Sequence, residues 1–379
     1  MKRILKILGY VLAVITALLL LASAMSGYFN PGRNVLLTLF SLILPYMWVA
    51  TIFVLVLLLV FRQWRPALVV AAAIVLSWGS IRLVSPITLF RSHASETDRK
   101  LTLVTFNVRN FGIYDGMQKD INPNLKYVLD TYPDVAILQE ASLTRNHYES
   151  LPSIKPLLKE LNKKYPYRSH GWHDVIIMSK YPYRFVEQEL KWKGIEHGWD
   201  QESDHRVYFA KVFDVFAGDD TVRVIGVHLN PIGLSMKERT SYEEKTRMKN
   251  MKSMEQNKNN LRWFYRHIAK KLKQASVKRV EEAKELRDVI DRSPRNVILC
   301  GDFNDPPASY VYRTIRGSDM RDAYVDCCTG PAITYHENRM YFKIDHVLYR
   351  GGLRAVSSEV VKQGDSDHYP QLITFKFKN

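Results

Sequence analysis

The sequence predicts an α/β domain of layered sheets and helices that follows a membrane-spanning N-terminal region. Long apolar stretches occupy most of the first 91 of the 379 residues. Beyond them, short apolar runs typical of strands recur about every 20–40 residues, and helical patterns or long loops separate these runs. Strands that alternate with helices within one domain favour layered packing around sheets.

Residues 1–91 form the predicted membrane region. Residues 4–25 and 35–61 are both nearly all apolar, and a bilayer span needs roughly 20 such residues. Residues 67–90 form a third, weaker stretch that contains Arg82. Arg82 lies near one end of this stretch, where its side chain can reach the membrane interface. The region therefore predicts a multi-pass cell-membrane anchor of about three transmembrane helices.

The first apolar stretch has a second interpretation. A charged start precedes residues 4–25, and residues 22–24 (ASA) resemble a signal-peptidase site, so a cleaved signal peptide also fits. An uncleaved anchor is preferred because apolar stretches continue downstream. Basic residues favour the cytoplasm for the start and for the second loop, although Arg33 in the first loop opposes this orientation. These basic residues are Lys2, Arg3, Lys6, Arg62 and Arg65. With either interpretation, the chain beyond Arg91 is expected outside the cytoplasm.

Residues 92–100 are polar and are interpreted as a linker, and residues 101–379 as one domain. A short helix is expected at 124–131, and residues 235–292 have apolar side chains at helical spacing among alternating acids and bases. The strands expected in this domain are 101–106, 134–138, 174–179, 206–216, 221–227, 296–300, 344–349 and 372–377.

The charge is strongly basic and partly local. The formal net charge is +16, and residues 233–279 hold fourteen Lys and Arg against four Asp and Glu. Such a segment is either a solvated helix face or a surface for anionic lipid headgroups or a phosphate-rich substrate. On an anchored domain, the membrane surface or an anionic substrate is favoured. The three cysteines show no disulfide framework and no zinc-binding spacing.

Polar residues of a narrow chemical range lie at the ends of the predicted strands or shortly beside them. They are Asn107, Glu140, His228, Asn230, Asp302, Asn304, Asp345, Asp367 and His368. Each one singly could be a turn or a strand-end cap, but turn chemistry would supply Gly, Ser and Pro as freely. Carboxylates and amides without thiolates suit Mg²⁺ or Mn²⁺ better than zinc. The strand ends therefore predict a site for a hard divalent cation.

The order of these motifs resembles the endonuclease/exonuclease/phosphatase superfamily, which includes DNase I-like nucleases. The resemblance covers about residues 100–379 and rests on TFNVRNFG, ILQE, GVHLN, ILCGDFND, IDHVLY and SDHYP, in that order. It implies a four-layered α/β sandwich, in which two packed, largely antiparallel sheets lie between helices. It also implies divalent-metal-dependent hydrolysis of phosphoester bonds.

The resemblance further implies a role for each matching residue. Glu140 would be the main metal ligand, with Asn107 beside it and Asp367 as a further ligand. Asp302 would orient and deprotonate the attacking water, and Asn304 would position water and phosphate. His228 and Asn230 would bind the scissile phosphate. His368, paired with Asp345, would contact the phosphoryl group and stabilise its developing charge.

Two departures from this pattern affect expectations about the pocket. Asp174 stands where many relatives carry a small residue, which predicts a change in local packing or in the pocket rim. A basic helical insertion at about 233–292 separates the His228 motif from the Asp302 motif. It resembles an elaboration of membrane-anchored bacterial members, and it is a place where substrate choice can be set.

The sequence thus predicts a membrane-anchored hydrolase, a phosphodiesterase rather than a phosphomonoesterase, with membrane lipids but no protein among its partners. Two substrate classes remain open: a lipid or headgroup phosphoester, and DNA or RNA. A long open basic groove would favour nucleic acid, whereas a closed pocket beside an apolar rim would favour lipid. A different class of protein, a non-catalytic anchored binding module, also remains open because fold alone never proves activity.

Overall fold

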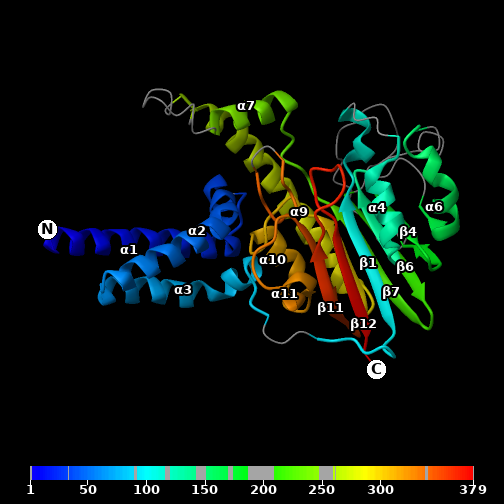
Figure 1. Ribbon diagram of the computed structural model, residues 1–379, viewed down its shortest axis with the longest axis horizontal. Coiled ribbons are helices and arrows are strands. Elements are labelled where there is room, and N and C mark those ends of the chain that lie inside the picture. The colour runs from blue at the N-terminus through cyan, green and yellow to red at the C-terminus, as the bar shows by residue number, and fades with distance from the viewer. Residues whose placement is uncertain are drawn as a thin grey trace.

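Two six-stranded sheets lie face to face with helices on their outer faces, and three long helices project from one side (Figure 1). This arrangement confirms the predicted α/β sandwich. The computed structural model describes residues 2–32, 34–88, 92–115, 120–141, 151–169, 174–186, 209–246, 259–260, 262–337 and 340–378.

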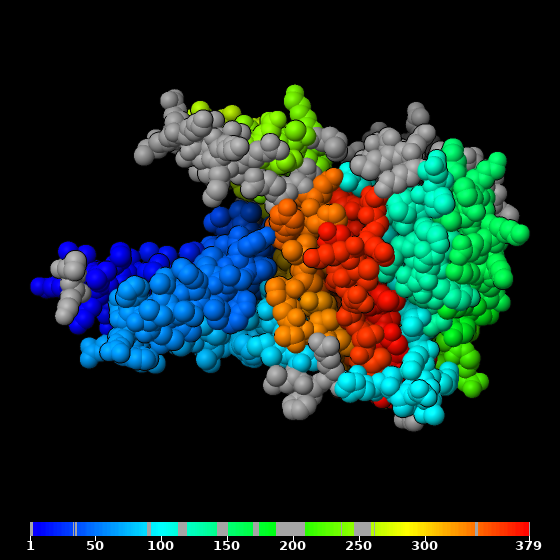
Figure 2. Space-filling model, in the orientation of Figure 1, coloured from blue at the N-terminus to red at the C-terminus, as the bar shows by residue number. Residues whose placement is uncertain are grey.

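The N-terminal helices are each long and apolar enough to cross a membrane, and they pack side by side. They are α1 (Lys2–Met25), α2 (Val35–Val60) and α3 (Trp64–Val84). A short 3-10 turn, η1 (Ser26–Tyr28), follows α1. Helix α3 begins before the predicted third stretch and ends earlier, because Pro86 disfavours helical backbone at the residue before it. In Figure 2 these blue helices meet the orange part of the chain.

Sheet A has the strand order β11-β12-β1-β2-β4-β3. Strands β1 and β2 are parallel and the other neighbours are antiparallel. Its strands are β1 (Lys100–Asn107), β2 (Val135–Gln139), β3 (Tyr167–Arg168), β4 (Val175–Ser179), β11 (Leu353–Val360) and β12 (Gln371–Phe377). The short helices nearby are η2 (Arg109–Asp115), α4 (Pro123–Thr131), η3 (Lys155–Leu157) and α6 (Leu158–Lys164).

Sheet B has the strand order β5-β6-β7-β8-β10-β9. Strands β7 and β8 are parallel and the other neighbours are antiparallel. Its strands are β5 (Tyr183–Phe185), β6 (Ala210–Ala217), β7 (Asp220–His228), β8 (Val297–Asp302), β9 (Arg321–Asp322) and β10 (Asp345–Arg350). The remaining helices are α7 (Met236–Thr246), η6 (Tyr265–Ala269), α9 (Lys270–Arg292), α10 (Tyr310–Arg316) and α11 (Ala323–Cys327).

The inner faces of the two sheets form one apolar core, to which Leu103 of β1 and Ile298 of β8 both belong. Gly226 in β7 allows a close approach of the sheets. A Cβ placed there would lie 2.6 Å from Cγ2 of Ile137 and 2.8 Å from Cγ1 of Val175, both in sheet A. The absence of a side chain at this position therefore helps to set the spacing between the sheets.

The outer faces of the sheets are covered differently. Helices α4 and α6 cover sheet A through a second apolar core. The core on the outer face of sheet B includes α9 and α10, and it continues into α1, α2 and α3 through residues such as Ala24 and Ile81. Polar contacts reinforce this junction: the Oγ atoms of Thr38 and Ser276 are 3.0 Å apart, and Arg313 donates to Ser80. The three N-terminal helices and the domain thus share a core.

Three predicted features differ in detail. Strand β11 was not predicted, since only its first half alternates between buried and half-buried side chains and a bulge interrupts its pairing. The helical segment predicted at 235–292 contains α7 and a later helix that continues through the π-helical turn η6 into α9, while residues 247–258 and 261 lie outside the described residues. Of the strand predicted at 206–216, residues 206–208 also lie outside them, and β6 begins at Ala210.

Candidate active site

The ends of β1 and β2 bring two predicted metal ligands together. These parallel strands pair with Asn107 opposite Gln139, so Glu140 comes one residue beyond the paired end of β2. The Asn107 amide donates from Nδ2 to Oε1 of Glu140 over 3.0 Å. Glu140 has a positive φ of 49°, a conformation that is uncommon for residues with a side chain. The turn thus begins at the residue whose carboxylate faces Asn107.

Sheet B brings three more predicted residues together. In the parallel pair β7 and β8, His228 lies opposite Asp302. In the antiparallel pair β8 and β10, Asp302 lies opposite Asp345. Residues opposite one another on neighbouring strands are about 5 Å apart, so the register alone places these three residues in a row.

Asp302 is at the centre of the site, and its side chain is almost fully buried. Its Oδ2 accepts from Asn107 Nδ2 over 3.2 Å and lies 3.7 Å from His228 Nε2 and 3.6 Å from His368 Nε2. Burial raises the pKa of Asp302 to about 6, while the two histidines oppose the shift and Asp345 adds to it. The carboxylate therefore sits between two imidazoles and titrates closer to neutrality than an exposed aspartate does.

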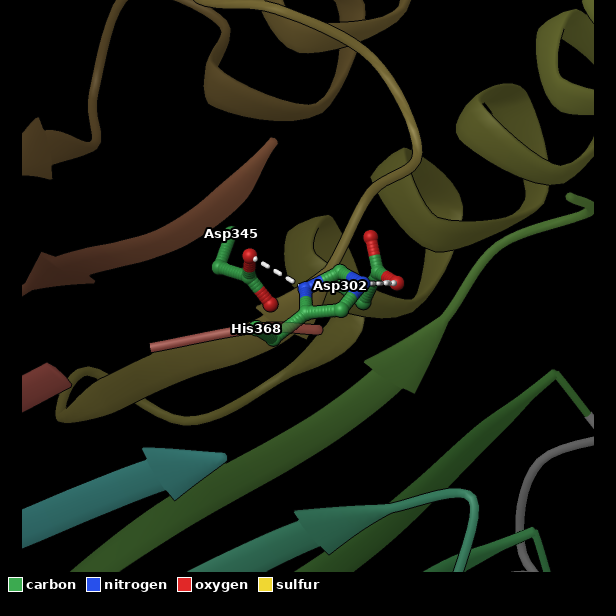
Figure 3. A group of neighbouring side chains, drawn as sticks. All are labelled: Asp302, Asp345 and His368. Carbon is green, nitrogen blue, oxygen red and sulfur yellow. Dashed lines mark hydrogen bonds and ion pairs between the residues drawn. The ribbon is translucent and has the colours of Figure 1, made fainter. Parts of the chain in front are cut away.

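His368 joins Asp302 to Asp345 (Figure 3). Its Nδ1 is 2.9 Å from Oδ2 of Asp345, and its Nε2 points to Asp302. Burial lowers the pKa of this imidazole, but the carboxylates of Asp345 and Asp302 outweigh burial and raise the pKa of His368 to about 10. His368 is therefore a buried cation held between two acids.

His228 forms a second histidine–aspartate pair. Its Nδ1 is 2.5 Å from Oδ2 of Asp174. Burial opposes protonation, yet the neighbouring carboxylates, Asp174 first, raise the pKa of His228 well above its usual value. Within the described residues its Nε2 is buried without a hydrogen-bond partner, 3.9 Å from Oε1 of Glu140. This atom is available to a ligand that enters between Glu140 and Asp302.

Both histidine–aspartate pairs cross from one sheet to the other. His228 ends β7 in sheet B, and its partner Asp174 directly precedes β4 in sheet A. Asp345 begins β10 in sheet B, and His368 precedes β12 in sheet A. The contact of Asn107 with Asp302 also crosses the gap. The geometry of the site therefore depends on how the two sheets are aligned.

Two predicted phosphate-binding residues lie in the loops after β7 and β8. Asn304 has a φ of 50°, its backbone N–H donates to Oδ1 of Asp302, and its Nδ2 donates to the carbonyl of Leu229. Asn230 is held through its backbone: its N–H donates to Glu282 and its carbonyl accepts from Arg279, both on α9. The basic insertion thus anchors one of these loops.

Asp367 lies at the edge of the cluster. Its Oδ2 is 3.6 Å from Nη1 of Arg239 and 3.9 Å from Nη1 of Arg109. Glu337 accepts from both arginines, over 2.8 Å from Arg109 and 3.2 Å from Arg239. The structure therefore surrounds this predicted metal ligand with two cations, one of which is contributed by α7 in the insertion.

The donor set fits a hard divalent cation. Asp302 and Asp345 offer carboxylate oxygen atoms, which lie within 4.8 Å of each other and of a ring nitrogen of the cationic His368. The carboxylate of Glu140, which is one-third exposed, lies beside them with Asn107. These donors are mainly oxygen atoms, which Mg²⁺ and Mn²⁺ prefer, and the unpartnered Nε2 of His228 marks room for a ligand.

Sequence analysis missed the positioning residues around the site. Asp174 was expected to change the pocket rim, but it pairs with His228. The signal was its place directly before a strand that pairs with 135–139, which puts it beside Glu140. Arg279 and Glu282 had no such signal, because they belong to a helix whose sequence is that of a solvated basic helix although both side chains are buried.

A family model for the endonuclease/exonuclease/phosphatase family matches residues 104–368. The chain therefore belongs to this family, whose members are metal-dependent phosphoester hydrolases, and it is an enzyme of that class. Residues 3–84 match a second family model, described as a domain of unknown function (DUF8431). A search of curated proteins finds no match.

Solved structures with a similar chain trace include a Beutenbergia cavernae endonuclease/exonuclease/phosphatase, with 17% identity and a TM-score of 0.45 over 74% of this chain and 72% of that one. A Bacteroides thetaiotaomicron protein of the same family has 12% identity and a TM-score of 0.43 over 75% of this chain and 100% of that one. Humanized D. rerio TDP2 has 15% identity and a TM-score of 0.42 over 73% and 98%.

Proposed function

We propose that this protein is a membrane-anchored phosphodiesterase that depends on Mg²⁺ or Mn²⁺. The observation that carries the proposal is the convergence on Oδ2 of Asp302, where one amide and two imidazoles from both sheets lie within 3.7 Å. A buried carboxylate between two charged imidazoles suits proton transfer beside a phosphoryl group. Phosphoryl transfer depends chiefly on such positioning and charge neutralisation.

The metal would be held by Glu140 and Asn107, with Asp367 as a further ligand. When bound, a divalent cation lowers the pKa of a coordinated water and screens the charge of the phosphate. Glu140 and Asn107 already contact each other. Asp367 lies beside Arg239 and Arg109, so its carboxylate would be shared between these cations and the metal.

The protein's own groups would carry the proton transfers. Asp302 would accept the proton of the attacking water, since its pKa of about 6 leaves it ionised but basic at neutral pH. His228, whose pKa is raised, would donate from Nε2 to the phosphoryl oxygens or the leaving group. His368, held by Asp345, would stabilise the developing negative charge. Asn304 and Asn230 would position water and phosphate.

The three apolar helices would anchor the enzyme in the cell membrane. Lys6, Arg62 and Arg65 gather at the end of these helices far from the domain, where Gln63 donates to the carbonyl of Leu5. Basic residues favour the cytoplasmic side. The domain meets the opposite end (Figure 1), which supports an extracytoplasmic catalytic domain after three passes.

We propose the same division of the chain as the sequence predicts. Residues 1–91 are the membrane region, 92–100 a linker and 101–379 the catalytic domain, with the basic insertion at about 233–292. Residues 92–99 contain no helix or strand, which supports the linker. The shared core of α1, α2 and α3 with α9 and α10 means that the two parts are packed together despite this boundary.

A nuclease acting on DNA or RNA is the second candidate, because several exposed cations lie on the insertion. A non-catalytic binding module is disfavoured by the intact cluster of Asp302, Asp345 and His368. Its histidine pairs and charged centre would have little use in a protein that only binds.

The test is hydrolysis by the full-length chain in detergent micelles, with Mg²⁺ and then with EDTA. The substrates are plasmid DNA, RNA, a phospholipid and bis-p-nitrophenyl phosphate. We expect turnover that EDTA abolishes and that Asp302→Ala lowers by roughly 10²–10⁴-fold, the usual contribution of a general base. Circular dichroism should show that this variant stays folded. Equal turnover by the variant and the wild type would refute the assigned site.

A further inference from the structure

The insertion forms one wall of a groove that begins at the catalytic loop after β7. Residues 230–233 form the opposite wall, and the helical segment Tyr265–Lys278 faces them across a volume of about 1210 Å³. We call this space the basic groove. Asn230, which lines the groove, comes two residues after His228 in the sequence. The groove is therefore an extension of the proposed active site.

Four basic side chains in the groove have no acidic or hydrogen-bonding partner among the described residues. Arg266, Lys270, Lys273 and Lys278 line it and are exposed to solvent. None of the four makes an ion pair or hydrogen bond with a residue that the structure describes, unlike Lys271, which contacts Glu238 over 2.6 Å. Four unpaired cations in one concave surface attract anionic ligands.

The groove lies level with the end of a membrane-spanning helix. Ser276, on the same helix as the cations, is 3.0 Å from Thr38 in the first turn of α2, and the candidate span of α2 starts at Leu36. Lys273 is three residues from Ser276, a rise of about 4.5 Å along an α-helix. Lys273 and Lys278, which are within three residues of Ser276, therefore lie close to the plane where the apolar part of the bilayer ends.

Aromatic and apolar side chains share this level. Tyr265 lines the groove and is 68% exposed, and Val277 between the lysines is 37% exposed. In the connection between α1 and α2, Tyr28 and Phe29 are each 55% exposed. Exposed aromatic residues at the ends of membrane spans are typical of the headgroup region. A ligand here would meet cations and apolar surface together.

We propose that the basic groove binds the headgroup of an anionic phospholipid from the surrounding bilayer. This inference rests on the proposed anchoring of the three apolar helices in the membrane. Lys and Arg side chains near an anionic membrane attract its headgroups. Nucleic acid is disfavoured as the ligand because, in this groove, its phosphates would lie against the bilayer surface, and an anionic bilayer would repel them.

The test measures binding without turnover. The full-length chain in non-ionic detergent, with EDTA present, is titrated with dihexanoylphosphatidylglycerol and separately with dihexanoylphosphatidylcholine, and binding is followed by calorimetry. We expect the phosphatidylglycerol to bind at least roughly tenfold more tightly, a difference that corresponds to about 1.4 kcal/mol. Equal affinity for the two lipids would overturn the inference.

A matched pair of variants locates the binding. The groove variant carries Arg266→Glu, Lys270→Glu, Lys273→Glu and Lys278→Glu. The control variant carries Lys155→Glu, Lys159→Glu, Lys163→Glu and Lys284→Glu, which are exposed lysines outside the groove. We expect phosphatidylglycerol affinity to fall roughly tenfold or more in the groove variant and to stay unchanged in the control. An equal loss in both would show a general charge effect and overturn the site.

Two further measurements separate the possible failures. A twelve-nucleotide oligothymidylate that binds wild type but not the groove variant at 150 mM NaCl, while phosphatidylglycerol does not bind, would overturn the inference in favour of nucleic acid. Hydrolysis of bis-p-nitrophenyl phosphate by wild type with Mg²⁺ tests the proposed function separately. Turnover of this substrate without phosphatidylglycerol binding would refute the lipid site and leave the phosphodiesterase intact.

Discussion

The two sheets contribute to the same site, but different helices pack on their outer faces. Sheet A carries Asn107 and Glu140 at its strand ends and is covered by the short helices α4 and α6. Sheet B carries His228, Asp302 and Asp345 and is covered by α9, α10 and the three membrane helices. Half of the site is thus held by helices of the domain alone, and the other half by helices that also pack on α1, α2 and α3.

A buried polar path connects α2 to the loops of sheet B. Thr38 contacts Ser276, and Arg279 donates to Ser276 Oγ, to Asp305 and to the carbonyl of Asn230. All four side chains of this path, Thr38, Ser276, Arg279 and Asp305, are buried. The link toward sheet A is only partly buried: Thr88 donates to the carbonyl of Cys328, and Cys328 donates to the carbonyl of Ser358 in β11. Membrane contact should therefore matter more to sheet B, and variants can test this.

The largest effect is expected from Arg279→Met. The ion pair of Arg279 with Asp305 is almost fully buried, and removing one partner leaves an uncompensated charge, which costs roughly 3–5 kcal/mol of unfolding free energy. Lys180→Met is the counterpart in sheet A, because the pair of Lys180 with Asp134 is partly exposed and should cost only about 0–1 kcal/mol.

Denaturant unfolding in detergent measures the loss of unfolding free energy in Arg279→Met and in Lys180→Met. The double variant Arg279→Met/Asp305→Leu should recover most of the loss, because an apolar pair can replace a buried ion pair. If Arg279→Met unfolded at the same denaturant concentration as Lys180→Met, the difference between the two sheets would not hold.

The next effect concerns the histidine pairs that join the sheets. Asp174→Asn keeps the shape but removes the charge that orients His228 and favours its protonation. We expect kcat for bis-p-nitrophenyl phosphate to fall roughly 10–100-fold, as for other orienting partners. Asp345→Asn, which acts on His368 from the other sheet, should have a similar effect. A fall with Asp345→Asn alone would show that sheet A does not orient His228 for catalysis.

A smaller effect is expected where the sheets approach each other. Gly226→Ala would place a Cβ against Ile137 and Val175, and overpacking of this kind costs roughly 1–3 kcal/mol. Thermal unfolding followed by circular dichroism measures the loss, and kcat should fall with it because both histidine pairs span this gap. Gly79→Ala is the control, since no atom lies within 4 Å of the added Cβ. Equal melting temperatures for the two variants would contradict the close approach.

The smallest effect tests the path from the membrane. Thr38→Val removes the hydroxyl that contacts Ser276 and keeps the volume. Loss of one hydrogen bond costs roughly 0.5–1.5 kcal/mol of stability. Because Arg279 connects Ser276 to the loop of Asn230, we expect this loss to displace the loop and to lower kcat roughly two- to tenfold. Thr51→Val on the same helix is the control, because the hydroxyl of Thr51 donates only to the carbonyl of Met47 in its own helix. A similar fall in both variants would point to a general effect on α2.

The local pattern of apolar and polar residues was sufficient to predict several strands and helices. Strands β1, β2, β4, β7, β8, β10 and β12 lie within about two residues of their predicted positions, because buried strands are short runs of apolar and β-branched residues bounded by breakers. The membrane helices were equally visible. Strand β11 was missed, since its second half is mainly polar and has no buried side chain.

The sequence by itself determined the three apolar helices, the order of the motifs along the chain and the nine polar residues at the strand ends. Apolar runs and ligand-type side chains are local properties of a sequence, so they can be read without the fold. Only the tertiary structure decided that Asp174 pairs with His228, that Arg279 is buried in a helix that looks solvated, and that the membrane helices complete the outer core of sheet B. These contacts join residues far apart in the chain, and they depend on the packing of one surface on another, which no local pattern records.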